Sequence, residues 1–172
     1  LLDRADAETP VDVVVVGAGF AGMYMLHRLR GQGMTARVYE QGSGVGGTWY
    51  WNRYPGIACD VESYSYFPLL EEMEYVPTMK FASGFEIFEY CQKMAEKFEF
   101  YDHCLFHTTV TKTEWDEDAG RWTVHTERGD AMKARYVILA NGILTTPKLA
   151  RIRGMESFQG ESFHTSRWNY NI

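Results

Sequence analysis

The sequence predicts an α/β fold that combines a parallel sheet with an antiparallel three-stranded β-meander. Three observations support this prediction: four consecutive valines run into a glycine-rich turn, a helical pattern follows that turn, and three β-rich segments separated by turns come later. Short apolar runs of β-branched residues are typical of strands buried on both faces of a parallel sheet. We expect one domain over residues 11–142, an N-terminal tail over residues 1–10 and a linker over residues 143–172.

The opening strand and its turn lie in residues 11–22, VDVVVVGAGFAG, which contain the pattern G-x-G-x-x-G. Gly17 permits a tight turn, Gly19 lets the backbone approach a pyrophosphate, and Gly22 lets the following helix pack closely on the strand. The helix N-terminus offers free N–H groups to phosphates. A glycine-rich turn without a ligand is the alternative. The candidate cofactor-binding residues here are Gly17, Gly19, Phe20, Ala21 and Gly22.

A second strand and an acidic residue complete a Rossmann-like unit. The helical pattern after the turn has an apolar stripe of Met23, Leu26 and Leu29. Ala36–Tyr39 reads as the second strand, with Glu40 at its tip. Glu40 comes eighteen residues after Gly22, close to the spacing of about 20 residues at which a carboxylate accepts hydrogen bonds from a ribose. Strand, turn, helix and acid together favour a dinucleotide site.

The bulk composition is that of an ordinary globular protein, and the charge argues against some classes of binding partner. The chain has 172 residues, 45% hydrophobic and 23% charged, with a net charge of −6. This charge and the lack of a Lys/Arg run argue against nucleic acid and anionic membrane surfaces. No stretch is long and apolar enough for a membrane span. Residues 1–10 lack an apolar core and read as a frayed tail, not a signal peptide.

Three cysteines, Cys59, Cys91 and Cys104, are far apart and odd in number. This usage suits reduced thiols in a cytoplasmic protein. A zinc site at His103, Cys104 and His107 is disfavoured because no fourth ligand is evident. We therefore expect no metal.

A second glycine-rich segment occupies residues 41–60. Its first half supplies flexible glycines, and residues 49–55, WYWNRYP, supply flat side chains and a proline. This composition is too irregular for a helix or a regular strand. It indicates backbone wrapped around a planar ligand, with a packed Ω-loop as the alternative. The candidate cofactor-binding residues are Gly47, Thr48, Trp49, Tyr50, Trp51 and Asp60.

Ser63–Phe67 reads as a short, aromatic and extended segment. Ser83 and Glu86 form a capping box in which each side chain satisfies the other's backbone N–H. The helix that they open has an apolar face expected to be core: Ile87, Cys91, Met94 and Phe98.

The meander is expected over three segments, His107–Trp115, Arg121–Thr126 and Ala131–Leu139. The turn before the last segment contains Arg-Gly-Asp at residues 128–130, read as a turn and not as an adhesion motif. Residues 136–142 read as a buried strand that ends in small residues, which suits close approach of a ligand.

The chain ends in a pattern F-x-G-x-x-x-H-x-x-x-W, formed by Phe158, Gly160, His164 and Trp168. With it, the chain resembles the N-terminal part of the Baeyer–Villiger monooxygenases, which are class B flavoprotein monooxygenases. Residues 46–60 match that family's pattern G-G-x-W-x4-[FY]-P-G-x3-D, and the first glycine motif matches its FAD site. Two departures are modest: Asn169 replaces the usual Pro or Asp, and Asn141 replaces Thr in Ala-Thr-Gly. Flavin N- and S-oxygenases share this layout but usually lack the tryptophan.

The resemblance implies an enzyme that uses FAD, NADPH and O2 to convert ketones to esters or lactones through a C4a-peroxyflavin. It implies that Glu40 holds the adenosine ribose, that Tyr66 is a further flavin contact and that the backbone of Val110 lies near adenine. Asp60 matches a catalytic aspartate that pairs with an arginine absent from this sequence. His164 and Trp168 are read as coupling two domains.

The NADPH-binding motif of that family is also absent, so the resemblance implies a fragment or one part of a split enzyme whose remainder is a separate chain. A flavin N- or S-oxygenase and a non-catalytic FAD-binding module remain alternatives. A plain NAD-dependent dehydrogenase does not explain the segment from Gly46 to Asp60. The sequence does not identify the ketone.

Overall fold

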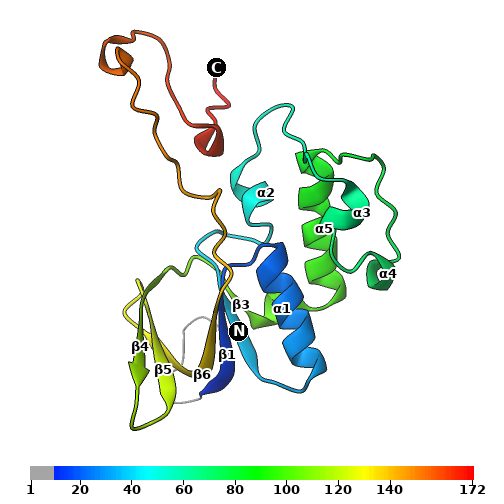
Figure 1. Ribbon diagram of the computed structural model, residues 1–172, viewed down its shortest axis with the longest axis vertical. Helices are drawn as coiled ribbons and strands as arrows, with labels where there is room; N and C mark the ends of the chain where they lie inside the picture. Colours follow the sequence, from blue (N-terminus) through cyan, green and yellow to red (C-terminus); the bar gives the residue numbers. More distant parts are fainter. Residues whose placement is uncertain (1–9) are drawn as a thin grey trace.

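A single six-stranded mixed sheet organises the computed structural model, which describes residues 10–172 (Figure 1). Residues 1–9 of the expected tail lie outside the described part. The strand order is β3-β2-β1-β6-β5-β4. The strands are β1 (Val11–Val16), β2 (Ala36–Tyr39), β3 (Cys104–Leu105), β4 (Val110–Asp116), β5 (Arg121–Thr126) and β6 (Ala131–Leu139).

Strand β6 joins the parallel and antiparallel parts of the sheet. Its early residues pair antiparallel with β5, up to the partners Trp122 and Ala134, while Ala134–Leu139 pairs parallel with β1. Strands β1, β2 and β3 are parallel as well. The predicted fold class is confirmed, but the meander is continuous with the parallel sheet.

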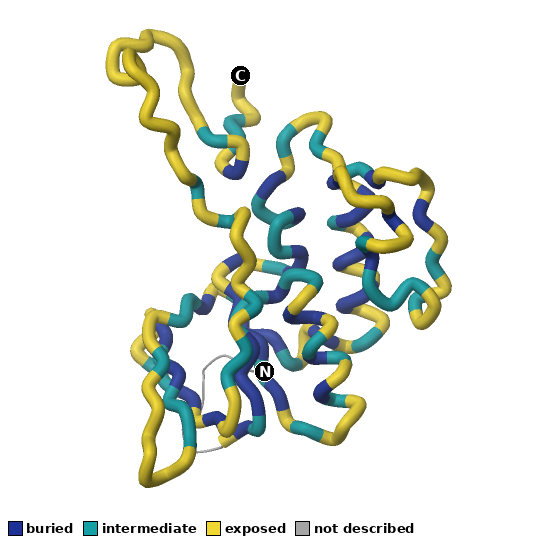
Figure 2. The backbone as a smooth tube through the Cα atoms, in the orientation of Figure 1, coloured by how far each residue is buried: buried dark blue, intermediate teal, exposed yellow. Residues whose placement is uncertain are grey.

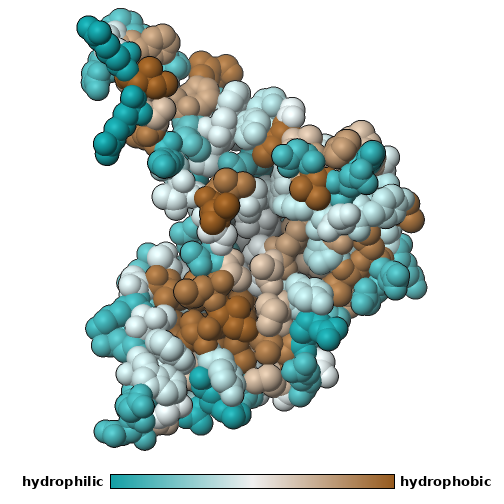
Figure 3. All heavy atoms as spheres, in the orientation of Figure 1, coloured by the Kyte–Doolittle hydropathy of each residue, from teal (hydrophilic) through white to brown (hydrophobic). Residues whose placement is uncertain are grey.

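The expectation that residues 136–142 form a buried strand is wrong. Tyr136 and Leu139 are 51% and 71% exposed. The reason is that β5 ends its pairing at Ala134, so the later residues of β6 have a strand neighbour only on the β1 side. Figure 3 shows apolar atoms gathered over this part of the surface.

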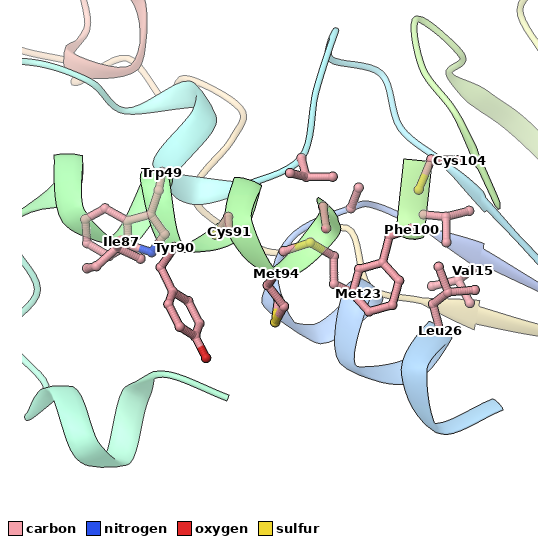
Figure 4. Packing of buried hydrophobic residues seen from close by; sticks show 14 of the residues in the cluster. Val15, Met23, Leu26, Trp49, Ile87, Tyr90, Cys91, Met94, Phe100 and Cys104 are labelled. Atoms are coloured by element: carbon pink, nitrogen blue, oxygen red, sulfur yellow. The ribbon is translucent and has the colours of Figure 1, made fainter. Parts of the chain in front are cut away.

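The helices pack on one face of the sheet. They are α1 (Phe20–Gly31), α2 (Thr48–Trp51), α3 (Ser63–Tyr66), α4 (Leu70–Met73) and α5 (Gly84–Lys97), with the 3₁₀ turn η1 (Phe100–His103). Two further 3₁₀ turns, η2 (Met155–Ser157) and η3 (Thr165–Arg167), lie in the C-terminal segment. Helices α1 and α5 meet in a core that includes Met23, Leu26, Ile87, Cys91 and Met94 (Figure 4). The predicted apolar stripes of both helices are therefore confirmed as packing faces.

The opposite face of the sheet has a smaller core, in which the meander covers β1 and β2. Val14, Tyr39, Val124 and Met132 are buried together there. Burial of the Tyr39 side chain raises the pKa of its phenol. The two cores fix the positions of the strand ends, where the candidate site lies.

Several local expectations need correction. Ser63–Phe67 is not extended, because its first four residues form α3, and the segment expected to be irregular contains the helical turn α2. The capping box forms only in half. Ser83 accepts a hydrogen bond from the Glu86 N–H at 3.2 Å, but the Glu86 carboxylate accepts from Tyr75 and Thr78 instead.

Residues 147–163 form an extended arm that is almost wholly exposed (Figure 2). The chain then returns, so that residues 167–170 lie beside the segment after α2. Among residues 10–172, no helix has the length and hydropathy needed to cross a membrane.

Candidate functional site

A pocket of about 370 Å³ lies at the carboxyl ends of β1, β2 and β6. In open α/β sheets this edge is where ligands bind. We call residues 17–19, Glu40 and residues 47–51 the near wall, and residues 139–146 the far wall. Residues 108–110 close the end beside β2.

The first glycine motif shapes the near wall by close backbone packing. Gly17 has a φ of +105°, and a Cβ there would lie 2.6 Å from the Ala140 carbonyl oxygen. A Cβ at Gly22 would lie 1.9 Å from the Gly17 carbonyl oxygen. The last three residues of the motif form the first turn of α1, whose N-cap, Gly19, has no side-chain cap. The N-terminus of α1 can therefore donate backbone N–H groups to an anion in the pocket.

The second glycine-rich segment touches the first. A Cβ at Gly47, where φ is +53°, would lie 2.8 Å from the Cα of Gly19. Nearby, the Gly46 N–H donates to the Ala18 carbonyl at 2.9 Å. Two sequence patterns about thirty residues apart thus form one surface, on which a ligand can approach bare backbone.

Glu40 connects these segments through its buried carboxylate, which is 5% exposed as a residue. One oxygen accepts from the Ala18 N–H at 2.8 Å, and the other accepts from the Gly42 N–H at 2.7 Å. Its backbone carbonyl accepts from the Thr108 N–H at 2.9 Å. A carboxylate offers about four lone-pair sites, so acceptor capacity remains for ligand hydroxyl groups.

The four candidates in α2 divide into two kinds. Thr48 and Trp51 line the pocket. Trp49 is buried in the core and donates from Nε1 to the Tyr66 hydroxyl at 2.9 Å. Tyr50 lies against the glycine-rich segment, and its hydroxyl hydrogen-bonds both the N–H and the hydroxyl of Ser43. These Ser43 hydrogen bonds lower the pKa of Tyr50.

Other predicted residues lie outside the pocket lining. The Phe20 ring packs edge-on against Tyr66, with centroids 5.5 Å apart. Burial raises the pKa of the Tyr66 phenol. Ala21 is exposed on α1, and Asp60 is exposed next to the buried Cys59.

Sequence reasoning missed the closing end and most of the far wall. Val110 lines the pocket, and so do Thr108 and Thr109, which were not named from the sequence. The small residues after β6 had been recognised as suited to a ligand without being named as site residues. One general rule could have identified them. All these residues follow parallel strands, and the carboxyl ends of such strands meet at one edge of the sheet.

The fingerprint residues lie away from the pocket. Phe158 and Gly160 are exposed in the arm. His164 caps η3, where Nδ1 accepts from the Ser166 N–H at 3.1 Å. The Trp168 ring lies 6.0 Å from that of Tyr54 and 4.9 Å from that of Phe163, so it packs on the segment after α2.

Comparison with known proteins identifies the relatives of this chain. Residues 15–79 match the NAD(P)-binding Rossmann-like domain family. The chain is 50% identical to neopentalenolactone D synthase of Streptomyces avermitilis over 171 residues. It is 52% identical to a Baeyer–Villiger monooxygenase of Streptomyces coelicolor over 168 residues. The chain is homologous to Baeyer–Villiger monooxygenases.

The similarity extends to structure and involves part of each relative. These alignments include 98% and 97% of this chain but 29% and 28% of the two relatives. A crystal structure of OTEMO in complex with FAD and NADP superposes with a TM-score of 0.85 at 38% identity, over 94% of this chain and 31% of that one. The chain therefore spans less than a third of the length of each of these relatives.

Proposed function

We propose that this chain forms the FAD-binding part of a monooxygenase that inserts one oxygen atom of O2 into a ketone. The overall reaction would be ketone + O2 + NADPH + H⁺ → ester or lactone + NADP⁺ + H2O. One observation carries the proposal. The two glycine-rich segments meet at Gly19 and Gly47 beside the buried Glu40, in a chain that is 52% identical to a Baeyer–Villiger monooxygenase.

The residues present fit a dinucleotide. Side chains at Gly17 or Gly47 would clash with the backbone of Ala140 or Gly19, and both positions have positive φ, so glycine there keeps the two segments close together and the pocket lined by bare backbone. The uncapped N-terminus of α1 favours negative charge there. Solved relatives support the choice of cofactors, since the OTEMO complex contains FAD and NADP.

Each site residue then has a proposed role. FAD, when bound, supplies the redox chemistry with NADPH and O2. The backbone at Gly17, Gly19 and Gly22 holds the pyrophosphate, and the remaining lone pairs of Glu40 accept from the adenosine ribose. The backbone of Val110 borders the adenine. Along the flavin side lie Gly47, Thr48 and Trp51, with Trp49, Tyr50 and Tyr66 behind them, while Phe20 and Ala21 belong to the first turn of α1.

Two further roles come from the family resemblance alone. Asp60 would pair with an arginine from outside this sequence and help to keep a developing negative charge in place. Phe158, Gly160, His164 and Trp168 would couple residues 11–142, the FAD-binding domain, to an NADPH-binding domain through the linker of residues 143–172. The exposure of Asp60 and the packing of Trp168 on the segment after α2 are compatible with both roles.

The test is to purify the protein expressed from its complete gene and record its visible spectrum. We expect flavin bands at close to one FAD per chain, NADPH oxidation that increases with a cyclic ketone, and a product one oxygen atom heavier than the ketone. Oxygenation of an amine or a sulfide without any lactone would instead identify an N- or S-oxygenase. Protein that neither contains nor binds FAD would disprove the proposal.

A further inference from the structure

The far wall of the pocket has few bonds to the rest of the molecule. The Ala140 N–H donates to the Val16 carbonyl at 2.8 Å, which is the last sheet hydrogen bond of β6. Beyond it, within the described residues, only two side chains tie residues 141–146 to other segments by hydrogen bonds, those of Asn52 and Arg167. Five of these six residues line the pocket. Whatever holds this segment therefore sets the position of one wall.

Asn52 makes the stronger link. It is 9% exposed and directly follows α2. Its Nδ2 donates to the Thr48 carbonyl at 2.9 Å and to the Leu144 carbonyl at 2.9 Å. Thr48 lies on the near wall and Leu144 on the far wall, so a single amide group joins the two sides. Both protons of that amide are used.

Arg167 makes a second and weaker link between the same two walls. Its Nη2 donates to the Thr145 carbonyl at 3.5 Å. Its Cζ lies 4.7 Å from the ring centroid of Trp51, a residue that lines the pocket. Arg167 is exposed, and exposed cation–π contacts are worth only about 0.5–1 kcal/mol.

We propose that Asn52 is a positioning residue for cofactor binding, which fixes residues 141–146 against α2 and so sets the width of the pocket, with Arg167 as the weaker second link. This inference rests on the proposed function for its ligand, FAD. The Asn52 amide donates to two carbonyl oxygens, one on each wall, so a side chain that replaces it must supply two N–H donors. A carboxylate has no proton to donate at neutral pH, and an alkyl group of the same size has none at all.

The experiment compares Asn52→Leu, Asn52→Asp and Arg167→Ala with a matched control, Ser63→Ala. Ser63 is also buried, and its hydroxyl also holds a loop in place: it donates to the Met79 carbonyl at 2.8 Å and accepts from the Ala82 N–H at 3.2 Å. Neither Ser63 nor its partners line the pocket. Two quantities are measured in the protein expressed from its complete gene, the FAD dissociation constant and the deuterium uptake of residues 141–147 without FAD.

The Asn52 variants are expected to bind FAD about tenfold more weakly, since losing a buried hydrogen bond has an effect of this order. Deuterium uptake over residues 141–147 should become faster, while uptake in β1 and α1 should not change. Arg167→Ala should change both quantities in the same direction by about threefold or less. Ser63→Ala should lower the thermal midpoint without changing either quantity.

Two results would overturn the inference. One is unchanged FAD affinity and unchanged uptake over residues 141–147 in the Asn52 variants. The other is a Ser63→Ala variant that weakens FAD binding as much as they do, which would show a general stability effect. If the wild type binds no FAD, the proposed function fails, but the uptake measurement still decides whether Asn52 holds the far wall. If neither Asn52 variant folds, the Arg167→Ala variant, in which only an exposed side chain changes, tests the inference by the same two measurements.

Discussion

The near wall of the pocket is held by close backbone packing and one buried carboxylate, whereas the far wall is held by side chains across long sequence distances. On the near wall, the Glu40 carboxylate accepts hydrogen bonds from the N–H groups of Ala18 and Gly42, which lie 22 and 2 residues away in sequence. On the far wall, the Asn52–Leu144 bond spans 92 residues. The near wall is therefore specified by its own sequence pattern, while the far wall depends on the tertiary fold that brings its partners together.

This difference has a consequence for function. The near wall should tolerate almost no change in backbone packing, because its close contacts are between main-chain atoms that have no alternative rotamers. The far wall should tolerate substitution with graded losses, because its links are individual side chains. Four predictions test this contrast, and the Asn52 experiment above complements them on the far wall.

The largest effect is expected from Gly22→Ala, at the position where α1 packs against Gly17 of the near wall. The new Cβ would lie 1.9 Å from the Gly17 carbonyl oxygen, so α1 must shift away from β1. Overpacking of this kind costs about 1–3 kcal/mol or more, and we expect the upper end together with loss of detectable FAD binding. Urea unfolding and the ratio of flavin to protein measure the two effects.

Gly31→Ala is the matched control on the same helix. Nothing lies within 4 Å of its Cβ position, and its φ is not positive. It should be neutral or stabilising, by up to about 1 kcal/mol. Equal damage by both substitutions would contradict the packing argument.

Glu40→Gln is expected to have the second largest effect. The amide can accept from one of the two N–H donors, Ala18 or Gly42, but presents its own NH2 group to the other. Hydrogen bonds to charged groups contribute about 1.5–3 kcal/mol, so we expect the free energy of unfolding to fall by about 2 kcal/mol. FAD affinity should fall as well, because the ribose would lose part of its acceptor.

The control for charge is Glu62→Gln, which removes an exposed ion pair with Lys80 at 2.8 Å. Such pairs contribute about 1 kcal/mol or less. A loss at Glu40 no larger than at Glu62 would show that the two buried hydrogen bonds do not stabilise the near wall.

The contrast between the walls also explains what sequence reasoning could reach. Gly17, Gly19, Glu40 and Gly47 were predicted because their spacing encodes local backbone contacts, and the structure brings all four to one pocket. Strands β1, β2, β4, β5 and β6 and the two long helices were predicted for a similar reason, since their residue patterns report burial directly, whereas the two-residue strand β3 was not predicted.

The rest depended on tertiary contacts that no local pattern encodes. Trp49 and Trp51 stand two residues apart in one aromatic run, yet the short helix α2 sends Trp49 into the core and leaves Trp51 at the pocket. Asn52 was passed over because a polar residue in an irregular segment gives no sign of a bond 92 residues away. Exposure of Tyr136 and Leu139 was missed because burial of β6 depends on which strands lie beside it.

Trp168→Leu changes a residue that belongs to neither wall, and it should have a smaller effect on FAD binding than Glu40→Gln. Trp168 packs on Tyr54 and Phe163, and neither lines the pocket. Loss of such ring contacts costs about 0.5–1.5 kcal/mol. We expect FAD affinity within about threefold of the wild type and a larger fall in ketone-dependent NADPH oxidation, if residues 164–168 couple two domains. Loss of FAD with unchanged turnover per flavin would contradict this role.

The smallest effect on the pocket is expected from Glu86→Gln, since Glu86 belongs to neither wall. Burial acts to raise the pKa of the Glu86 carboxyl, but hydrogen bonds from the Thr78 N–H, the Thr78 hydroxyl and the Tyr75 hydroxyl outweigh it and leave the pKa below its ordinary value of 4.5. A carboxyl whose pKa is lowered by folding stabilises the protein above its unfolded pKa and loses that contribution as the pH falls through the folded value.

The difference in unfolding free energy between wild type and Glu86→Gln should therefore be constant above about pH 5 and shrink below about pH 4.5. Denaturant unfolding at several pH values measures it. Glu89→Gln, which removes an exposed pair with Lys93 on the same helix, should cost less than about 1 kcal/mol at neutral pH. FAD affinity should stay at the wild-type value in both variants. A Glu86→Gln variant that binds FAD several-fold more weakly would show that the pocket depends on residues 75–86, and the contrast between two independent walls would then be too simple.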